Sequence, residues 1–268
     1  MKNILKDFLG MISKPIISKI HPFKDSHSGE ECYLVGGGIS IKWFDLSVFS
    51  DRTSIPAQWV PFHNDFRRLN VEHVVLPEPH FFWPYLKGPN GYWWRNRIQE
   101  AYREAIRENS KINFFINLSN YPVLKNSNVT FLYRNFQDKR LPDNFITNRI
   151  DSLGGTLTHS IILAIYLGYT HVYLVGYDYT HTPSRGLHWI EKGQGVFYPQ
   201  KDYLKEFFEI AKEFIDITTI TLDGASNFIN STTYKKHTGC DPLFKENTEL
   251  VDERYLKVLS TWPDYSIY

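Results

Sequence analysis

The chain of 268 residues has little cysteine, no long apolar run and no excess of either charge. Its two cysteines, Cys32 and Cys240, are too few for a disulfide framework or a four-cysteine zinc site. That scarcity favours a reducing, cytoplasmic compartment. Thirty Lys and Arg against 29 Asp and Glu leave a formal net charge of +1. So balanced a chain argues against a nucleic-acid partner, which would need a clustered basic face.

Several motifs with known chemistry are also missing. The sequence contains no Asp-x-Asp pair of the kind that holds a divalent metal in many sugar-nucleotide transferases. It contains no His-Glu-x-x-His and no Gly-x-Ser-x-Gly. We therefore expect chemistry without a protein-bound metal or cofactor, in which histidine and tyrosine serve as acid and base groups.

Short β-like runs alternate with amphipathic helical segments from about residue 31 onward. The expected strands are 31–37, 71–76, 112–118, 129–133, 171–176 and 218–222, and the expected helices are 97–109, 156–167, 201–215 and one starting near Ile41. Strands separated by helices predict an α/β fold with a doubly wound, mostly parallel sheet and flanking helices. We expect a single Rossmann-type domain over residues 31–268, with ligands beyond the carboxyl ends of the strands.

Two segments fall outside this alternation. Residues 1–30 form an amphipathic, basic segment with two open interpretations: a helix docked on the domain, or a peripheral anchor on the inner membrane surface. The stretch from Thr180 to Gln200 has no clear periodicity and carries three glycines and two prolines. An irregular segment of that length inside a compact domain is typical of a lid, so we expect it to be mobile until a ligand binds.

Glycines open two predicted helices, a pattern that lets backbone N–H groups approach a phosphate. The first strand runs into Gly36, Gly37, Gly38 and Ser40, and the second glycine site holds Gly154, Gly155 and Thr156. Neither matches the dinucleotide fingerprint or the P-loop. A tight turn at the first site and a threonine cap at the second remain the alternative interpretations.

The densest group of acid and base side chains follows the fifth strand. Tyr177, Asp178, Tyr179 and His181 stand there, and His188 with Trp189 follows in the lid. A position at a strand's carboxyl end favours function, and Trp189 is expected to offer a stacking face to a sugar. The alternative is that the histidines only pack and that Asp178 only caps a turn.

Five segments, taken in order, resemble the bacterial sialyltransferases of glycosyltransferase family 42. They are 36–42, 60–66 with Asn64, 75–82 with Glu78, 148–150 with Arg149, and 162–179. The resemblance covers roughly residues 31–230. It implies transfer of sialic acid from its CMP ester on a single GT-A-like α/β domain with no required metal. Gly37 and Glu78 depart from the family, which has asparagine at both places, and Thr180 stands where it has tyrosine.

The resemblance and the needs of such a donor together assign roles. Donor binding is expected from Gly36, Gly37, Gly38, Ser40, Asn64, Glu78, Gly154, Gly155, Thr156 and Asp178. His188, ahead of His181, would take the proton of the acceptor hydroxyl. A hydroxyl of Tyr177 or Tyr179 would stabilise the leaving phosphate, and Arg149 would pair with the donor carboxylate or orient the acceptor.

The leading hypothesis is an inverting glycosyltransferase. It would transfer sialic acid, Kdo or a related nonulosonic acid from the CMP ester to a bacterial surface glycan or glycolipid, as in lipopolysaccharide or capsule synthesis. Two alternatives stay open: a pyrophosphokinase-like or other nucleotide-handling enzyme, which would need ATP and Mg²⁺, and a non-catalytic glycan- or nucleotide-binding module.

Overall fold

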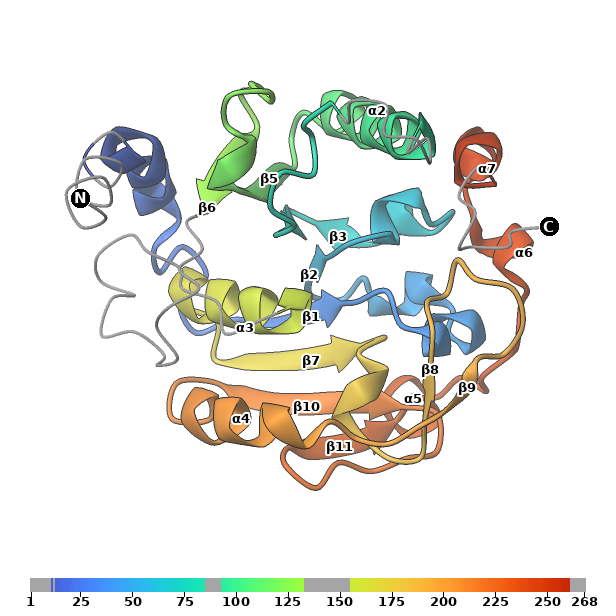
Figure 1. Ribbon diagram of the computed structural model, residues 1–268. Coiled ribbons are helices and arrows are strands. Elements are labelled where there is room, and N and C mark those ends of the chain that lie inside the picture. The colour runs from blue at the N-terminus through green and yellow to red at the C-terminus, as the bar shows by residue number, and fades with distance from the viewer. Residues whose placement is uncertain (1–10, 12, 85–92, 133–154, 261–268) are drawn as a thin grey trace.

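The computed structural model describes residues 11, 13–84, 93–132 and 155–260, and its centre is a parallel sheet (Figure 1). Six strands form it in the order β11-β10-β7-β1-β2-β3, and every neighbouring pair is parallel. Their bounds are β1 Glu31–Val35, β2 Thr53–Pro56, β3 Asn70–Val71, β7 His171–Val175, β10 Asp216–Thr221 and β11 Asn230–Thr233.

A second parallel sheet continues the first on the far side of β2. Its order is β4-β5-β6, with bounds His73–Leu76, Asn113–Asn117 and Val129–Leu132. A parallel bridge between Ala57 and Val75 joins the two sheets, and only Glu72 separates β3 from β4. The chain thus builds one twisted layer from β11 to β6.

Both faces of the layer are buried because alternate strand residues enter different cores. In β1, Tyr33 and Val35 pack in one cluster, whereas Cys32 and Leu34 pack in the other. The helices α2 (Trp93–Glu108) and α7 (Glu253–Leu259) cover the first side, and α3 (Gly155–Leu167) and α4 (Lys205–Ala211) cover the second (Figure 1). This arrangement confirms the predicted doubly wound, mostly parallel α/β fold.

The shorter elements connect these layers. They are the helices α5 (Tyr234–Thr238) and α6 (Asn247–Leu250), the hairpin β8 (Ser184–Gly186) with β9 (Val196–Tyr198), and the 3-10 turns η1 (Ser18–Phe23), η2 (Ile39–Trp43), η3 (Leu46–Phe49), η4 (Val60–Phe62), η5 (Phe66–Arg68), η6 (Leu118–Asn120), η8 (Asp178–Thr180) and η9 (Asp202–Leu204). Nowhere in the described ranges is a helix both long and apolar enough to cross a bilayer.

All six predicted strands are present, but two helix predictions were wrong in extent. The helix expected from Ile41 is the 3-10 turn η2, which is buried from Ile39 through Lys42 and so lacks the polar face of a longer amphipathic helix. The helix expected over 201–215 ends at Ala211, and Phe214, which lies beyond that end, is 52% exposed. Beyond Ala211 the chain turns into β10.

The strand order contains one reversal, and it positions the site. From β1 the chain builds outward through β2, β4, β5 and β6, and then returns through α3 to β7 on the other side of β1. In open α/β sheets, ligands bind beyond the carboxyl ends of the strands at such a switch point. The place to search is therefore where β1 and β7 end.

Candidate active site

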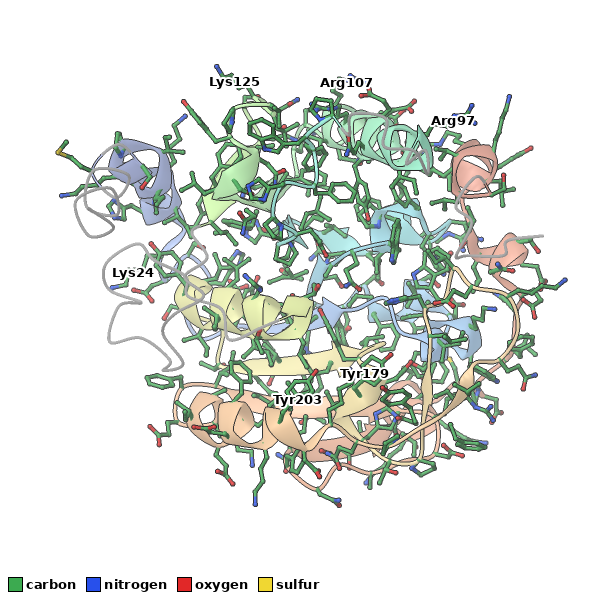
Figure 2. The ribbon with its side chains drawn as sticks, viewed as in Figure 1. Lys24, Arg97, Arg107, Lys125, Tyr179 and Tyr203 are labelled. Atoms are coloured by element: carbon green, nitrogen blue, oxygen red, sulfur yellow. The ribbon has the colours of Figure 1, made fainter. Side chains whose placement is uncertain are left out.

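A cavity of about 260 Å³ lies at this switch point, and we call it the switch-point cavity. Eight residues expected from the sequence line it: Gly37, Gly38, Gly155, Thr156, Tyr177, Asp178, Tyr179 and His188. Gln58, Lys201 and Tyr203 line it as well. Tyr179 and Tyr203 lie on the same side of the molecule, far from the cations Arg97, Arg107 and Lys125 on its opposite edge (Figure 2).

The glycine turn after β1 lets the loops after β1 and β7 approach each other closely. The Gly38 N–H donates to the Gly176 carbonyl over 2.8 Å, and the Gly36 N–H donates to the Val175 carbonyl over 2.8 Å. A Cβ at Gly38 would lie 2.5 Å from Asp178 Oδ2, and one at Gly36 would lie 2.7 Å from the Gly176 oxygen. The Gly38 N–H is therefore already hydrogen-bonded and is not available to a phosphate. The turn also leads into the 3-10 turn η2 rather than into the α-helix that the phosphate hypothesis assumed.

Asp178 is the buried side chain that fixes this turn. Its Oδ2 accepts the Ser40 N–H over 2.9 Å, whereas Asp178 Oδ1 and Ser40 Oγ have no hydrogen-bond partner among the described residues. Burial raises the pKa of the Asp178 carboxyl to about 6, against the lowering effect of its hydrogen bonds. Asp178 thus combines the expected capping role with an uncommitted oxygen in the site.

The second glycine site behaves as the amino end of a long helix. Gly155 begins α3 with φ +75°, and Thr156 follows it at the cavity wall. The Gln58 Nε2 donates to Thr156 Oγ1 over 3.0 Å, which ties the loop after β2 to the first turn of α3. The first-turn N–H groups and the dipole of this 13-residue helix favour an anion here.

Two tyrosines and one lysine add polar groups to the same cavity. The Tyr177 hydroxyl donates to Ser160 Oγ over 3.2 Å. Burial raises the Tyr177 pKa, the Ser160 bond lowers it, and the Glu78 carboxylate raises it further, so the phenol stays protonated. Lys201 Nζ lies 3.9 Å from the centre of the Tyr179 ring and has no carboxylate within ion-pairing distance in the described chain. A cation without a partner anion suits a phosphate.

His188 is held in a tautomer that suits a general base. Its Nδ1 lies 3.1 Å from the Gly37 carbonyl oxygen, and its backbone N–H donates to Glu191 Oε1. A carbonyl can only accept, so Nδ1 carries the hydrogen and Nε2 carries the lone pair in the neutral ring. The expected role of Trp189 was wrong, because its side chain is fully buried against His63 with ring centres 5.0 Å apart.

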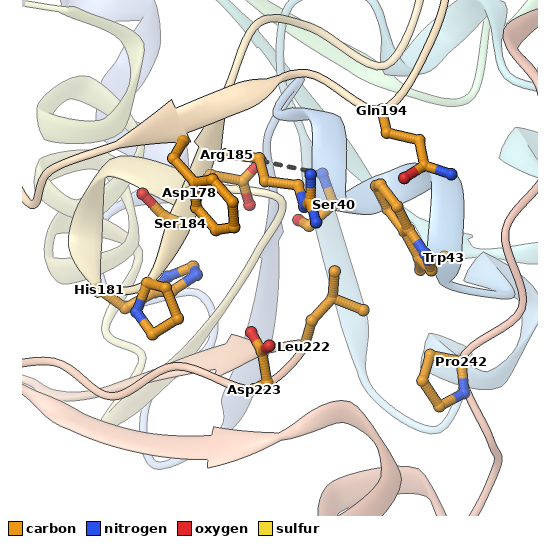
Figure 3. A pocket seen from close by; sticks show the side chains of 12 residues that line it. Ser40, Trp43, Asp178, His181, Ser184, Arg185, Gln194, Leu222, Asp223 and Pro242 are labelled. Atoms are coloured by element: carbon orange, nitrogen blue, oxygen red, sulfur yellow. Dashed lines mark hydrogen bonds between the residues drawn. The ribbon is translucent and has the colours of Figure 1, made fainter.

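A second cavity of about 400 Å³ adjoins the first, and we call it the lid cavity (Figure 3). Asp178 lines both cavities. His181 lines the lid cavity rather than the switch-point cavity; burial lowers its pKa to about 4, and its Nδ1 has no partner within the described chain. The Arg185 guanidinium enters beside Ser40 and stacks 5.6 Å from the Trp43 ring (Figure 3).

The lid is attached to the body by a buried lysine. Lys42 Nζ donates to the Gly193 carbonyl over 2.6 Å and pairs with Glu246 Oε2 over 3.1 Å. Burial lowers the Lys42 pKa, and the Glu246 carboxylate opposes that effect. An antiparallel bridge between Gly38 and His188 makes a second attachment. The lid is therefore joined both to the glycine turn and to the segment after β11.

Some expected site residues lie elsewhere. The Asn64 side chain donates to the Glu249 carbonyl over 2.7 Å and lines neither cavity, whereas Gln58 does reach the switch-point cavity. Glu78 follows β4 and acts on the site through the pKa of Tyr177. Arg149 and Gly154 lie outside the described residues. The sequence signal for Gln58 was weak, because β2 has only four residues and ends in proline.

Comparison with known proteins gave matches among solved structures only. No protein-family model and no curated protein matches the chain. Sialyltransferases are among the solved structures it resembles. The sialyltransferase CstII from Campylobacter jejuni in complex with cytidine-5'-monophosphate is 19% identical, with 86% of this chain and 97% of that chain covered at a TM-score of 0.41.

Two further structures show the same degree of likeness. The CstII complex with the substrate analogue CMP-3FNeuAc is 17% identical, covers 85% of this chain and 98% of its own, and has a TM-score of 0.39. The alpha-2,3-sialyltransferase from Campylobacter jejuni in apo form is 15% identical, with 82% of this chain and 91% of that chain covered, and also has a TM-score of 0.39. Likeness this low decides nothing about the reaction, so the function has to be argued from the site.

Proposed function

We propose that this chain is an inverting glycosyltransferase that uses a CMP-activated sugar as donor. The observation that carries the proposal is the convergence of the α3 amino end, Lys201 and the two tyrosines Tyr177 and Tyr179 on one cavity at the switch point. These groups suit a phosphate that leaves with negative charge. The family resemblance of the sequence motifs supplies the nucleotide, CMP.

The donor phosphate would lie at the amino end of α3. The N–H groups of Gly155 and Thr156 and the Lys201 ammonium would stabilise the charge that develops on the leaving phosphate. The Tyr179 phenol would donate to the same oxygens, because burial keeps it protonated. Tyr177 would do so only by giving up its hydrogen bond to Ser160 Oγ. Charge neutralisation by these groups supports turnover without a metal ion.

The sugar would be transferred in one displacement. The acceptor oxygen forms the new bond to the anomeric carbon while the bond from that carbon to the phosphate oxygen breaks, which inverts the configuration. His188 Nε2 takes the hydroxyl proton, and CMP departs with the bonding electron pair. Sialic acid, Kdo and related nonulosonic acids fit this scheme, with a bacterial surface glycan or glycolipid as acceptor.

The lid cavity is the place we assign to the acceptor sugar. Trp43 offers an aromatic face. Ser40 Oγ, Asp178 Oδ1 and His181 Nδ1, which have no hydrogen-bond partner among the described residues, offer hydrogen bonds to sugar hydroxyls. Since Asp178 borders both cavities, an acceptor bound there would lie against the donor site.

A ligand screen tests the nucleotide directly. CMP should raise the midpoint of thermal unfolding more than CDP, UDP, GDP or ATP do. At 100 times its Kd, CMP should add about 2.7 kcal/mol to the free energy of unfolding. Lys201→Ala should weaken CMP binding, whereas Lys205→Ala, an exposed lysine paired with Glu209, should not. Turnover of CMP-sialic acid and CMP-Kdo should survive EDTA. A preference for ATP with Mg²⁺ would favour the pyrophosphokinase instead, and CMP binding without turnover would favour a binding module.

A further inference from the structure

Far from the switch point, two histidines and a glutamate meet where the strands begin. His27 lies in the loop between η1 and β1, Glu72 lies between β3 and β4, and His73 is the first residue of β4. The strands are parallel, so this cluster lies at the opposite end of the sheet from the carboxyl-end glycines. We infer that it is a zinc site that fastens the loop before β1 to the start of β4.

The distances suit a single tetrahedral ion. His27 Nε2 lies 3.3 Å from His73 Nε2 and 3.6 Å from Glu72 Oε2, and the three ligand atoms lie within 4.8 Å of one another. Nitrogen and oxygen ligands at about 2.1 Å from tetrahedral Zn²⁺ lie roughly 3.4 Å apart. Two imidazoles and one carboxylate form a common ligand set for zinc, and the exposure of Glu72 leaves room for a water as fourth ligand.

The surroundings orient the ligands before any ion binds. His27 Nδ1 lies 3.0 Å from Glu30 Oε2, so Nδ1 carries the hydrogen and Nε2 directs its lone pair toward the cluster. The His27 ring stacks on Tyr169 with centres 4.7 Å apart, and the His73 ring meets Phe115 edge-on at 5.4 Å. The two histidines are 8% and 5% exposed, so neither ring can easily turn away.

The local charge also favours a cation. The Glu30 and Glu72 carboxylates both contact this imidazole pair, and within the described chain neither has a Lys or Arg partner. A divalent ion would neutralise both charges. The site is independent of the proposed transfer reaction, which is placed at the other end of the sheet.

Metal analysis of the full chain tests the inference. After dialysis against EDTA, calorimetric titration with ZnCl₂ should give one Zn²⁺ per chain, and Zn²⁺ should raise the unfolding midpoint. Glu30→Gln removes a hydrogen-bond partner of a ligand and should weaken Zn²⁺ binding by roughly 10- to 100-fold. His27→Gln and His73→Gln each remove a ligand and should weaken Zn²⁺ binding by more than that. His171→Gln is the matched control, because His171 also lies near a carboxylate, 3.8 Å from Glu31, but belongs to no three-ligand group among the described residues.

The outcomes separate clearly. If His73→Gln does not fold, the exposed Glu72→Gln carries the same test. Absence of stoichiometric Zn²⁺ uptake, or equal loss in His171→Gln, would overturn the site. CMP binding should be unchanged in Glu72→Gln, so a failure of the donor proposal and a failure of the zinc site are seen in different measurements.

Discussion

The side-chain amide of Gln58 donates to the hydroxyl of Thr156 over 3.0 Å and so connects two segments almost a hundred residues apart. Gln58 follows β2, and Thr156 is the second residue of α3. The Oε1 of the same side chain would lie 3.0 Å from a Cβ at Gly37, which is the position where the resembling family has asparagine. One glutamine therefore spans both glycine-bearing turns of the switch-point cavity.

Replacing Gln58 should weaken the nucleotide site. Gln58→Ala removes one hydrogen bond, worth about 0.5–1.5 kcal/mol net, so CMP affinity should fall by roughly 2- to 13-fold. Calorimetric titration with CMP measures this directly. Asn64→Ala is the matched control, because it loses the bond to the Glu249 carbonyl outside both cavities and should leave CMP affinity unchanged. The opposite ranking would restore the assignment of Asn64 to the donor.

The two lid histidines should differ in their effect on turnover. His188→Ala should lower kcat by about 10²–10⁴-fold, the usual contribution of a general base, with CMP affinity within a few fold. His181→Ala should lower kcat less, because its ring lines the lid cavity and burial lowers its pKa to about 4. Steady-state kinetics with a CMP-sugar donor decide between them. Equal turnover in both variants and the wild type would exclude a histidine base.

Acid should destabilise the protein through its buried histidines. Burial lowers the pKa of His63 to about 3 and that of His181 to about 4, whereas the unfolded chain titrates near 6.5. Between about pH 6.5 and 4 the unfolded state binds more protons, so the free energy of unfolding falls as pH falls. Asp178, with its pKa raised to about 6, acts in the opposite sense and offsets one histidine between about pH 6 and 4.

The contribution of His181 can be isolated from the slope of the free energy of unfolding against pH. Urea unfolding of the wild type and His181→Gln at several pH values should give a stability difference that changes by about 1.4 kcal/mol per pH unit between pH 6 and 4.5, with the wild type the more acid-sensitive. Parallel lines for the two proteins would mean that His181 becomes protonated in the folded state as readily as in the unfolded state.

The lid should respond to CMP unevenly. Trp189 and Ile190 are fully buried and should be protected from hydrogen exchange with or without nucleotide. Val196 and Phe197 are 59% and 73% exposed, so the hairpin strand β9 should gain protection when CMP binds. Exchange measured by mass spectrometry follows both peptides. Equal protection of β9 in the two states would contradict a ligand-ordered lid.

Sequence periodicity predicted the buried parts of the fold well and the junctions poorly. β1 and α3 were recognisable because their residues repeat with the period of their element and lie in the core. β2 and β11 were missed because Thr53–Pro56 is short and Asn230–Thr233 is polar. Missing β2 hid Gln58, since a side chain at a strand's end can be placed only after the strand is known.

The candidate site divides in the same way. Local motifs identified Gly37, Gly155 and Tyr179, because each lies beside an element with a clear pattern, and His188 was identified by its place in the lid. The burial of Trp189 depends on contacts with a segment more than a hundred residues earlier, around His63, which no local pattern encodes. Motif similarity likewise could not detect that Asn64 hydrogen-bonds to the α6 segment.

The pairing of Lys42 with Glu246 means that the segment after β11 helps to hold the lid in position. Asn247 Nδ2 donates to the Ile190 carbonyl, and the Lys245 N–H donates to the Lys42 carbonyl, so residues 245–247 form a seam between the glycine turn and the lid. A truncation that ends the chain before residue 245 would keep every residue that lines the two cavities, but it would remove the contacts that hold the lid. A catalytic fragment designed from the cavity residues alone would thus retain the cavity lining but have an unanchored lid.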